Sequence, residues 1–110
     1  MRINSLCGRV AFNAVMNGGS NFAASAVRVF VLEDFSSSSD CYLGLIVSKK
    51  VGNAVVRNKC KRRLRLIFAD LLHFLLCPGF AYVVLAQRRI KETDYASLLA
   101  QVSGAVARVY

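Results

Sequence analysis

Residues Val51 to Phe68 read VGNAVVRNKCKRRLRLIF, an apolar-and-basic segment long enough for five turns of helix. Six of the fifteen basic residues lie in this stretch, and Lys49 and Lys50 directly before it bring the number to eight. No Asp or Glu lies between Asp40 and Asp70. A helix face that only confers solubility usually mixes charges and gains from Glu–Lys pairs four residues apart. The absence of acids therefore points to a polyanionic partner.

The stretch predicts an amphipathic helix that starts after Gly52, with Asn53 as N-cap and Ala54 as the first helical residue. At 100° per residue, one apolar arc contains Val56, Cys60, Leu64, Ile67, Phe68 and Leu71. A contiguous outward stripe contains Arg57, Asn58, Lys61, Arg62 and Arg65. Lys59 and Arg63 fall on a third side. The helix can thus bury one face and hold cations outward on a rigid support.

The global composition agrees with a basic folded domain. The chain has 110 residues, of which 55% are hydrophobic, so we expect a single domain over residues 1–110 with one modest core. A net charge of +9 and a pI near 10.0 indicate nucleic acid or an acidic membrane surface as partner.

Other sequence features favour a cytoplasmic protein without a membrane span. Cys7, Cys41, Cys60 and Cys77 are scattered without a CxxC pair, which is typical of reduced, buried cysteines. The first ten residues lack the apolar run of a signal peptide. The apolar stretch from Leu66 to Ala86 is interrupted by Pro78-Gly79, which indicates a helix end followed by a strand.

Outward from the basic helix, the pattern predicts five further elements: a helix over Ser5–Asn17, strands over Ala26–Leu32, Tyr42–Val47 and Phe80–Ala86, and a final helix capped by Thr93 or Asp94. The first two strands are expected to pair as a hairpin across the serine-rich segment Glu33–Asp40. Helices packed on a small sheet make this an α+β fold.

Alternation in the first strand separates its two faces. Val27, Val29 and Val31 share one face, and Arg28 and Phe30 share the other. A phenylalanine on the face opposite the valines is available either for a second core or for a ligand.

The segment SKKVGNAVVRNKCKRRLR, Ser48 to Arg65, resembles the signature of the bacterial ribonuclease P protein subunit. That signature joins a Lys-Lys strand end to Gly-Asn-Ala-Val, Arg-Asn and Lys-Arg on a helix. The resemblance implies a small central sheet flanked by helices, in α-β-β-(β)-α-β-α order with a left-handed βαβ crossover. It also implies binding to a catalytic RNA and to the 5′ leader of precursor tRNA, assisting Mg²⁺-dependent removal of the leader.

The resemblance assigns residues to two sites. The residues matching the RNA-subunit contacts are Lys49, Lys50, Asn53, Arg57, Asn58, Lys61, Arg62 and Arg65. The residues matching the leader-binding cleft are Phe12, Met16, Arg28 and Phe30. Aromatic side chains can stack on unpaired bases without demanding a sequence. Ordinary core packing is the alternative for Met16 and Phe30.

No catalytic residue or metal ligand is expected in the chain itself. His73 is its only histidine and the six acidic residues are scattered, so the sequence lacks the clustered carboxylates that a self-contained metal-dependent nuclease needs. Catalysis is expected in the RNA, with Mg²⁺ held mainly by phosphates. The expected partners are the catalytic RNA and precursor tRNA, with no membrane and no evident protein partner. A structural RNA-binding protein of ribosomal type is the alternative, and a peripheral membrane protein fits less well.

Overall fold

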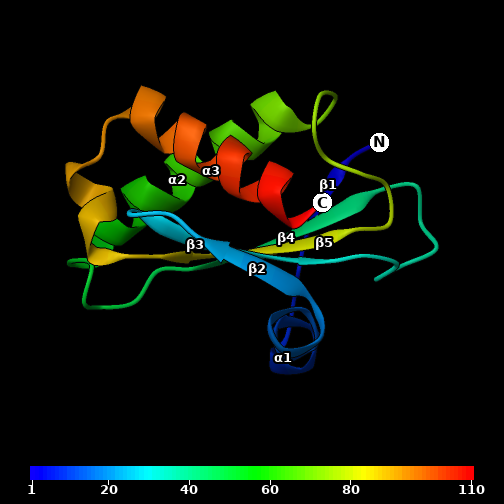
Figure 1. The fold of residues 1–110 in the computed structure, drawn as a ribbon. Helices are drawn as coiled ribbons and strands as arrows, with labels where there is room; N and C mark the ends of the chain where they lie inside the picture. Colours follow the sequence, from blue (N-terminus) through cyan, green and yellow to red (C-terminus); the bar gives the residue numbers. More distant parts are fainter.

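The computed structural model describes residues 1–110 as a five-stranded sheet with helices on both faces (Figure 1). The elements are β1 (Ile3–Ser5), α1 (Arg9–Gly18), β2 (Ser20–Ala23), β3 (Val27–Leu32), β4 (Cys41–Ile46), α2 (Ala54–Leu71), β5 (Ala81–Ala86), the 3₁₀ helix η1 (Arg88–Glu92) and α3 (Tyr95–Val109). Helices α2 and α3 cover one face of the sheet, and α1 lies alone on the other. The predicted α+β class is confirmed.

Strand β5 occupies the centre of the sheet, whose order is β1-β4-β5-β3-β2. It pairs in parallel with β4 and antiparallel with β3. Its sequence AYVVLA is apolar at every position, as a strand buried on both faces requires. Helix α2 connects the adjacent parallel strands β4 and β5, which forms the βαβ unit that the resemblance implies.

The predicted hairpin between the strands now labelled β3 and β4 is wrong. Both strands pair with β5, which lies between them, and β3 forms its hairpin with β2. A tight turn closes that hairpin, in which the Ala24 N–H donates to the Val27 carbonyl at 2.8 Å. The eight-residue segment Glu33–Asp40 is long enough to pass over an intervening strand, so closeness in sequence did not determine the pairing.

The N-terminal segment also differs from the prediction. Ile3–Ser5 forms the edge strand β1, parallel to β4, and the helix starts only at Arg9. Gly8 separates them with φ = +88°, a left-handed conformation that breaks a helix and suits glycine. Strand β2 and helix η1 were not predicted, because elements of four or five residues carry almost no periodic signal.

The main core lies between the sheet and helices α2 and α3, and it confirms the predicted apolar arc. Cys60, Leu64, Ile67 and Phe68 are all buried, while Val56 and Leu71 are half-buried against the same core. The three valines of β3 point into this core. None of the helices combines the length and apolar character needed to cross a membrane.

The starts predicted for the helices now labelled α2 and α3 are observed. Asn53 Oδ1 accepts from the Val56 N–H at 3.0 Å at the start of α2. Of the two candidate caps for the final helix, Asp94 is the residue used, because its Oδ1 accepts from the Ser97 N–H at 2.7 Å. These caps set the first turns of α2 and α3 and therefore the rotation of every side chain that follows.

A smaller core lies between the sheet and α1. It is built from Leu6, Val15, Phe30, Ala81 and Val83. Phe12 and Met16 of α1 pack against it as half-buried side chains. Since only one short helix covers this face, parts of the sheet beside α1 remain accessible.

Candidate RNA interface

Helix α2 holds the predicted outward stripe away from the main core. Asn58, Arg62 and Arg65 are exposed, whereas Arg57 and Lys61 are half-buried. The nearby acids are engaged elsewhere: Asp70 Oδ2 accepts from the Tyr95 hydroxyl at 3.0 Å, and Asp94 caps α3. The cations of the stripe are therefore available for an external anion.

Arg57 carries an unsatisfied donor within this stripe. Its Nε atom is buried and has no hydrogen-bond partner. A buried polar atom without a partner costs about 1–3 kcal/mol, and more when the group is charged. An acceptor from a bound ligand would remove this cost if the side chain moved slightly to admit it.

The turn before α2 adds two exposed lysines, Lys49 and Lys50. The first turn of α2 contains no acidic residue, so its N–H groups and dipole favour an anion there. Asn53, which the resemblance places among the RNA contacts, spends its Oδ1 on the cap and keeps its amide N–H₂ group for a ligand.

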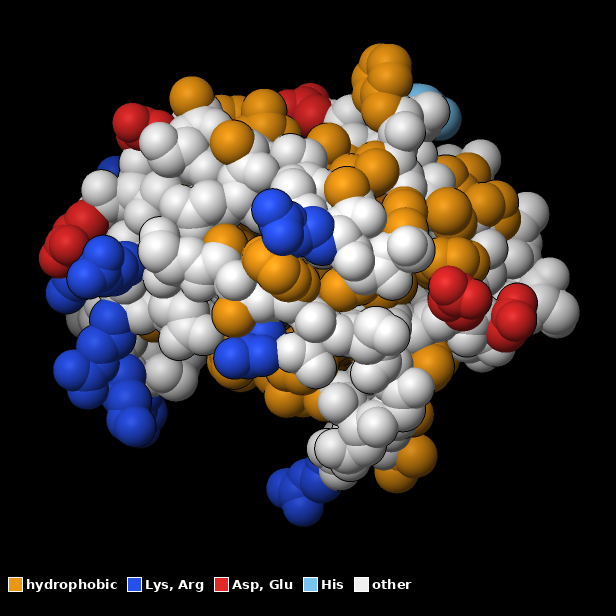
Figure 2. Space-filling view, viewed as in Figure 1, with side chains coloured by type: hydrophobic (Ala, Val, Ile, Leu, Met, Phe, Trp, Pro, Cys, Tyr) orange, Lys and Arg blue, Asp and Glu red, His pale blue; other side chains and the backbone are white.

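A second group of cations lies beside this turn and was not identified from the sequence. Arg88, Arg89 and Lys91 of η1 are exposed, and together with Lys50 and Glu92 they line a cavity of about 240 Å³ without any apolar side chain. Figure 2 shows Lys and Arg side chains gathered at the left edge of the molecule, where η1 lies in Figure 1. The signal in the sequence was three cations within four residues directly after a buried strand.

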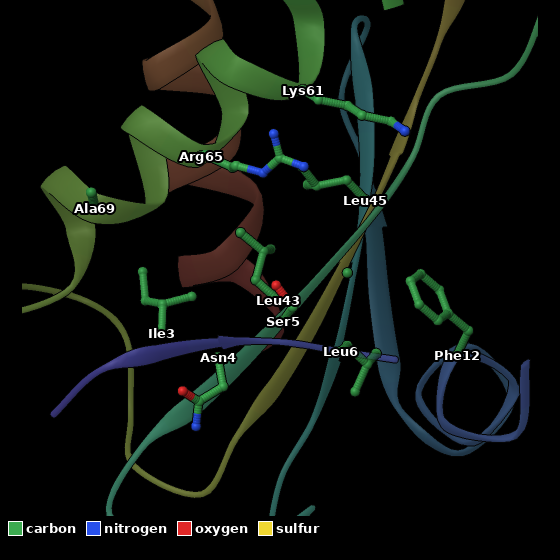
Figure 3. Close-up of a pocket in the computed structure, with 11 residues that line it drawn as sticks. Ile3, Asn4, Ser5, Leu6, Phe12, Leu43, Leu45, Lys61, Arg65 and Ala69 are labelled. Carbon is green, nitrogen blue, oxygen red and sulfur yellow. The ribbon is translucent and has the colours of Figure 1, made fainter. Parts of the chain in front are cut away.

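The largest opening near α1 brings the two predicted sites together. A cavity of about 400 Å³ lies along β1 and the adjoining open edge of β4, and its lining includes Phe12 from one site and Lys61 and Arg65 from the other (Figure 3). Phe12 reaches it from α1, and the two cations reach it from α2. One ligand could therefore contact an aromatic ring and two positive charges at once.

Gly44 on β4 provides the space that the Phe12 ring occupies. A Cβ atom at position 44 would lie 2.5 Å from Phe12 Cζ, well inside van der Waals contact. The ring therefore lies directly against the backbone of the strand. This close approach, rather than a turn, explains the need for glycine here.

The backbone of β4 is also unpaired along part of this cavity. The Leu43 carbonyl accepts from the Leu6 N–H at 2.9 Å, while Tyr42 pairs toward β5 on the opposite side. By the alternation of a parallel ladder, the N–H and C=O groups of Leu45 face the open side, past the last residue of β1. The cavity thus offers a backbone donor as well as cations.

The other predicted leader-site residues have different environments. Phe30 is only 8% exposed and belongs to the small core beneath α1. Met16 is half-buried against that core. Arg28 is half-buried, and its guanidinium donates to Asn21 Oδ1 at 2.6 Å. Phe12 is thus the aromatic residue of the set that lines the cavity, and Phe30 supports the floor beneath α1.

Two further aromatic residues on this face were not assigned from the sequence. Phe35 and Tyr42 are half-buried against the small core, with ring centroids 5.3 Å apart in an edge-to-face arrangement. Hydrogen bonding with Ser36 lowers the pKa of Tyr42 below its ordinary value. They extend the aromatic lining of the α1 face along β4.

The comparisons with known proteins agree on one family. A family model described as Ribonuclease P matches residues 1–110. The ribonuclease P protein component of Helicobacter acinonychis is 48% identical over 62 residues, which cover 56% of this chain and 39% of that protein. The ribonuclease P protein component of Geobacillus kaustophilus is 41% identical over 78 residues, which cover 69% of this chain and 64% of that protein. The chain thus covers less than two thirds of the length of these two relatives.

A solved structure shares the fold over nearly the whole chain. It is that of a Staphylococcus aureus RNase P protein mutant with defective mRNA degradation activity. The match has a TM-score of 0.83 at 25% identity and covers 96% of this chain and 89% of that one. The similarity therefore extends beyond the basic helix to the sheet and the helices on both of its faces.

Proposed function

The chain belongs to the Ribonuclease P family, whose model matches residues 1–110, and on this premise we propose that it is the protein subunit of ribonuclease P. In this role it binds a catalytic RNA and precursor tRNA, and it assists endonucleolytic removal of the 5′ leader. Residues 1–110 act as a single RNA-binding domain. The site of action is the cytoplasm.

The observation that carries this proposal is the acid-free cationic stripe of α2, whose members also line the cavity beside Phe12. A surface for RNA phosphates needs unpaired cations on a rigid element, and a surface for unpaired bases needs an exposed aromatic face. Here both lie around one opening. This arrangement supports RNA as the ligand better than an acidic membrane, because the apolar arc of α2 is already buried in the main core.

We assign the two RNA ligands to neighbouring surfaces. The surface for the catalytic RNA consists of Lys49, Lys50, Asn53, Arg57, Asn58, Lys61, Arg62 and Arg65, extended by the η1 cations Arg88, Arg89 and Lys91. The leader lies along the α1 face, where Phe12 stacks on a base. Lys61 and Arg65 lie on the border shared by the two surfaces, so they also reach the leader phosphates next to that base. Met16, Arg28 and Phe30 support that face.

Mg²⁺ belongs to the RNA in this proposal. No group of three or more His, Cys, Asp or Glu side chains is placed to hold a metal ion. The interface residues are mainly arginines and lysines, whose cationic groups offer no oxygen ligand, and no carboxylate lies among them to bind Mg²⁺. The protein's own contribution is to bind, to orient the substrate and to neutralise phosphate charge.

Reconstitution with the cognate catalytic RNA tests the proposal. With Mg²⁺ and a precursor tRNA, the complex should cut once and leave a mature 5′ end, while the protein alone should cut nothing. Metal-dependent cleavage by RNA-free protein would place the catalysis in the chain and contradict the proposal. A tight complex that gives no cleavage would instead favour a structural RNA-binding protein.

A further inference from the structure

Arg63 is the one cation of α2 whose guanidinium is bound to another part of the protein. It is half-buried, and its Nη1 donates to the Ile90 carbonyl at 3.4 Å. Its Nη2 donates to the Thr93 carbonyl. Both acceptors belong to η1 or to the residue that follows it. Since hydrogen bonds from a charged donor are stronger than neutral ones, these contacts tie the middle of α2 to the η1 turn.

The η1 turn has few other attachments. Ile90 is its only buried side chain. The Thr93 hydroxyl bonds within the segment, donating to the Arg89 carbonyl at 2.7 Å. The remaining cations, Arg88, Arg89 and Lys91, face solvent and repel one another at close spacing. Ile90 anchors the centre of the turn in the main core, and the Arg63 hydrogen bonds add a second anchor that fixes the orientation of the turn about Ile90.

We propose that Arg63 is a positioning residue that orients the η1 cations for RNA without contacting RNA itself. By fixing the turn against α2, Arg63 keeps Arg88, Arg89 and Lys91 beside Lys50, with which they line one cavity. The cations before α2 and those after β5 then form one continuous surface. This inference rests on the proposed function, because it requires the η1 cations to bind RNA phosphates.

Lys59 is the matched control for Arg63. It lies one turn earlier on the same side of α2, lines the same cavity as Arg63, Lys91 and Glu92, and is exposed. Losing Lys59 therefore removes the same charge from the same region but leaves both hydrogen bonds to η1 intact. Any difference between the two positions reports the anchor rather than the charge.

The first measurement uses free protein. Arg63→Met keeps the apolar stem of the side chain and removes the guanidinium. In this variant, amide hydrogen exchange over residues 88–93 should become about tenfold faster, because the turn has lost both hydrogen bonds from Arg63. A tenfold change corresponds to about 1.4 kcal/mol of local stability. Lys59→Met should leave this exchange unchanged. Unchanged exchange in Arg63→Met would show that the two hydrogen bonds do not hold the turn, and it would overturn the inference.

The second measurement is affinity for the catalytic RNA in a double-mutant cycle. Arg63→Met should weaken binding about three- to tenfold, as expected for partial loss of roughly two phosphate contacts. Most of the loss should disappear when Arg88→Gln and Arg89→Gln are already present, because Lys91 is then the one η1 cation left to position. Arg63→Lys should recover only part of the affinity, since one ammonium group replaces a fork that reaches two carbonyls.

The alternative outcomes are distinct. An Arg63→Met loss that persists undiminished beside Arg88→Gln and Arg89→Gln, together with full recovery in Arg63→Lys, would make Arg63 a direct phosphate contact and refute the positioning role. Tight RNA binding in every Arg63 variant would refute that role and leave the proposed function intact. Absence of RNA binding by the wild-type protein would instead end the proposed function, and the positioning role with it.

Discussion

Replacing Gly44 by alanine tests the close approach of Phe12 to β4. The new Cβ would lie 2.5 Å from Phe12 Cζ, 2.6 Å from Phe12 Cε2 and 3.2 Å from Leu6 Cδ2. Favourable contacts between carbon atoms start at about 3.5 Å, so the ring must retreat by about 1 Å. We expect a loss of about 1–2 kcal/mol in the free energy of unfolding. This lies at the lower end of overpacking costs, because the half-buried ring can move toward the cavity.

The sign of the effect should change once the ring is gone. In a Phe12→Ala background the main obstacle is absent, and only the milder contact with Leu6 remains. Alanine is then favoured over glycine within a strand by about 0.5–1 kcal/mol, because glycine loses more conformational entropy on folding. Gly44→Ala should therefore be neutral or slightly stabilising in that background.

Urea denaturation of the four proteins, with a common m-value, measures this coupling. An equal loss from Gly44→Ala with and without Phe12 would refute the reasoning, because it would mean that the ring is not what the Cβ meets. Affinity for the catalytic RNA provides the functional control. It should be nearly unchanged in Gly44→Ala if α2 carries most of that affinity, whereas affinity for precursor tRNA with a long leader should fall.

Three further predictions concern the RNA surface, the small core and pH. Replacing Arg57, Lys61 and Arg65 by alanine should weaken RNA binding and reduce its log–log salt slope by roughly 0.7 per lost contact on a single-strand scale; an unchanged slope would mean a merely solvated face. Phe30→Ala should cost about 3–5 kcal/mol of stability in thermal or urea unfolding. Any leader role for Phe30 requires an affinity loss confined to long-leader substrates, and an equal loss with a one-nucleotide leader would exclude it. Burial raises the pKa of Tyr82 from about 10 to about 12. The contribution of the neutral Tyr82 side chain to the free energy of unfolding is therefore complete below pH 10, and it is lost as pH rises toward 12. Urea titrations at pH 9 and 11.5 should show this decline, and Tyr82→Phe should reduce it.

Helix α2 could be predicted from the sequence because its determinants are local. The Asn53 cap, the apolar arc and the absence of acids all lie within one segment, and the observed helix follows the predicted rotation. The strand faces were predictable for the same reason, since alternation along β3 separates Val29 from Phe30 regardless of which strand pairs with it.

Strand pairing could not be predicted in the same way. The competition for β3 and β4 is decided by β5, which lies far along the chain and is apolar on both faces. The short β1 became visible only through its parallel pairing with β4. Pairing between distant segments depends on tertiary packing, which local propensity does not encode.

The candidate site shows the same limit. Helical angles separated Arg63 from the outward stripe, yet they could not reveal that its partners are carbonyls of η1. The resemblance assigned both Phe12 and Phe30 to the leader-binding cleft, but only Phe12 lines the cavity. Accessibility of a side chain on a shared face depends on where the covering helix lies, and for α1 that position follows from contacts with β3 and β5.

The central place of β5 also governs the order in which the chain can fold as it is synthesised. β5 is the last of the five strands to leave the ribosome, and until it arrives β3 and β4 have no shared partner. Helix α2 emerges earlier with its cations, before the complete sheet that supports it exists. Bringing this distant strand against β3 and β4 costs loop-closure entropy, and the other pairings become stable only after that cost is met. A nascent chain that stops short of Ala81 should therefore bind RNA only by non-specific electrostatic attraction. The defined arrangement of the α2 cations should form in one step when β5 joins the sheet.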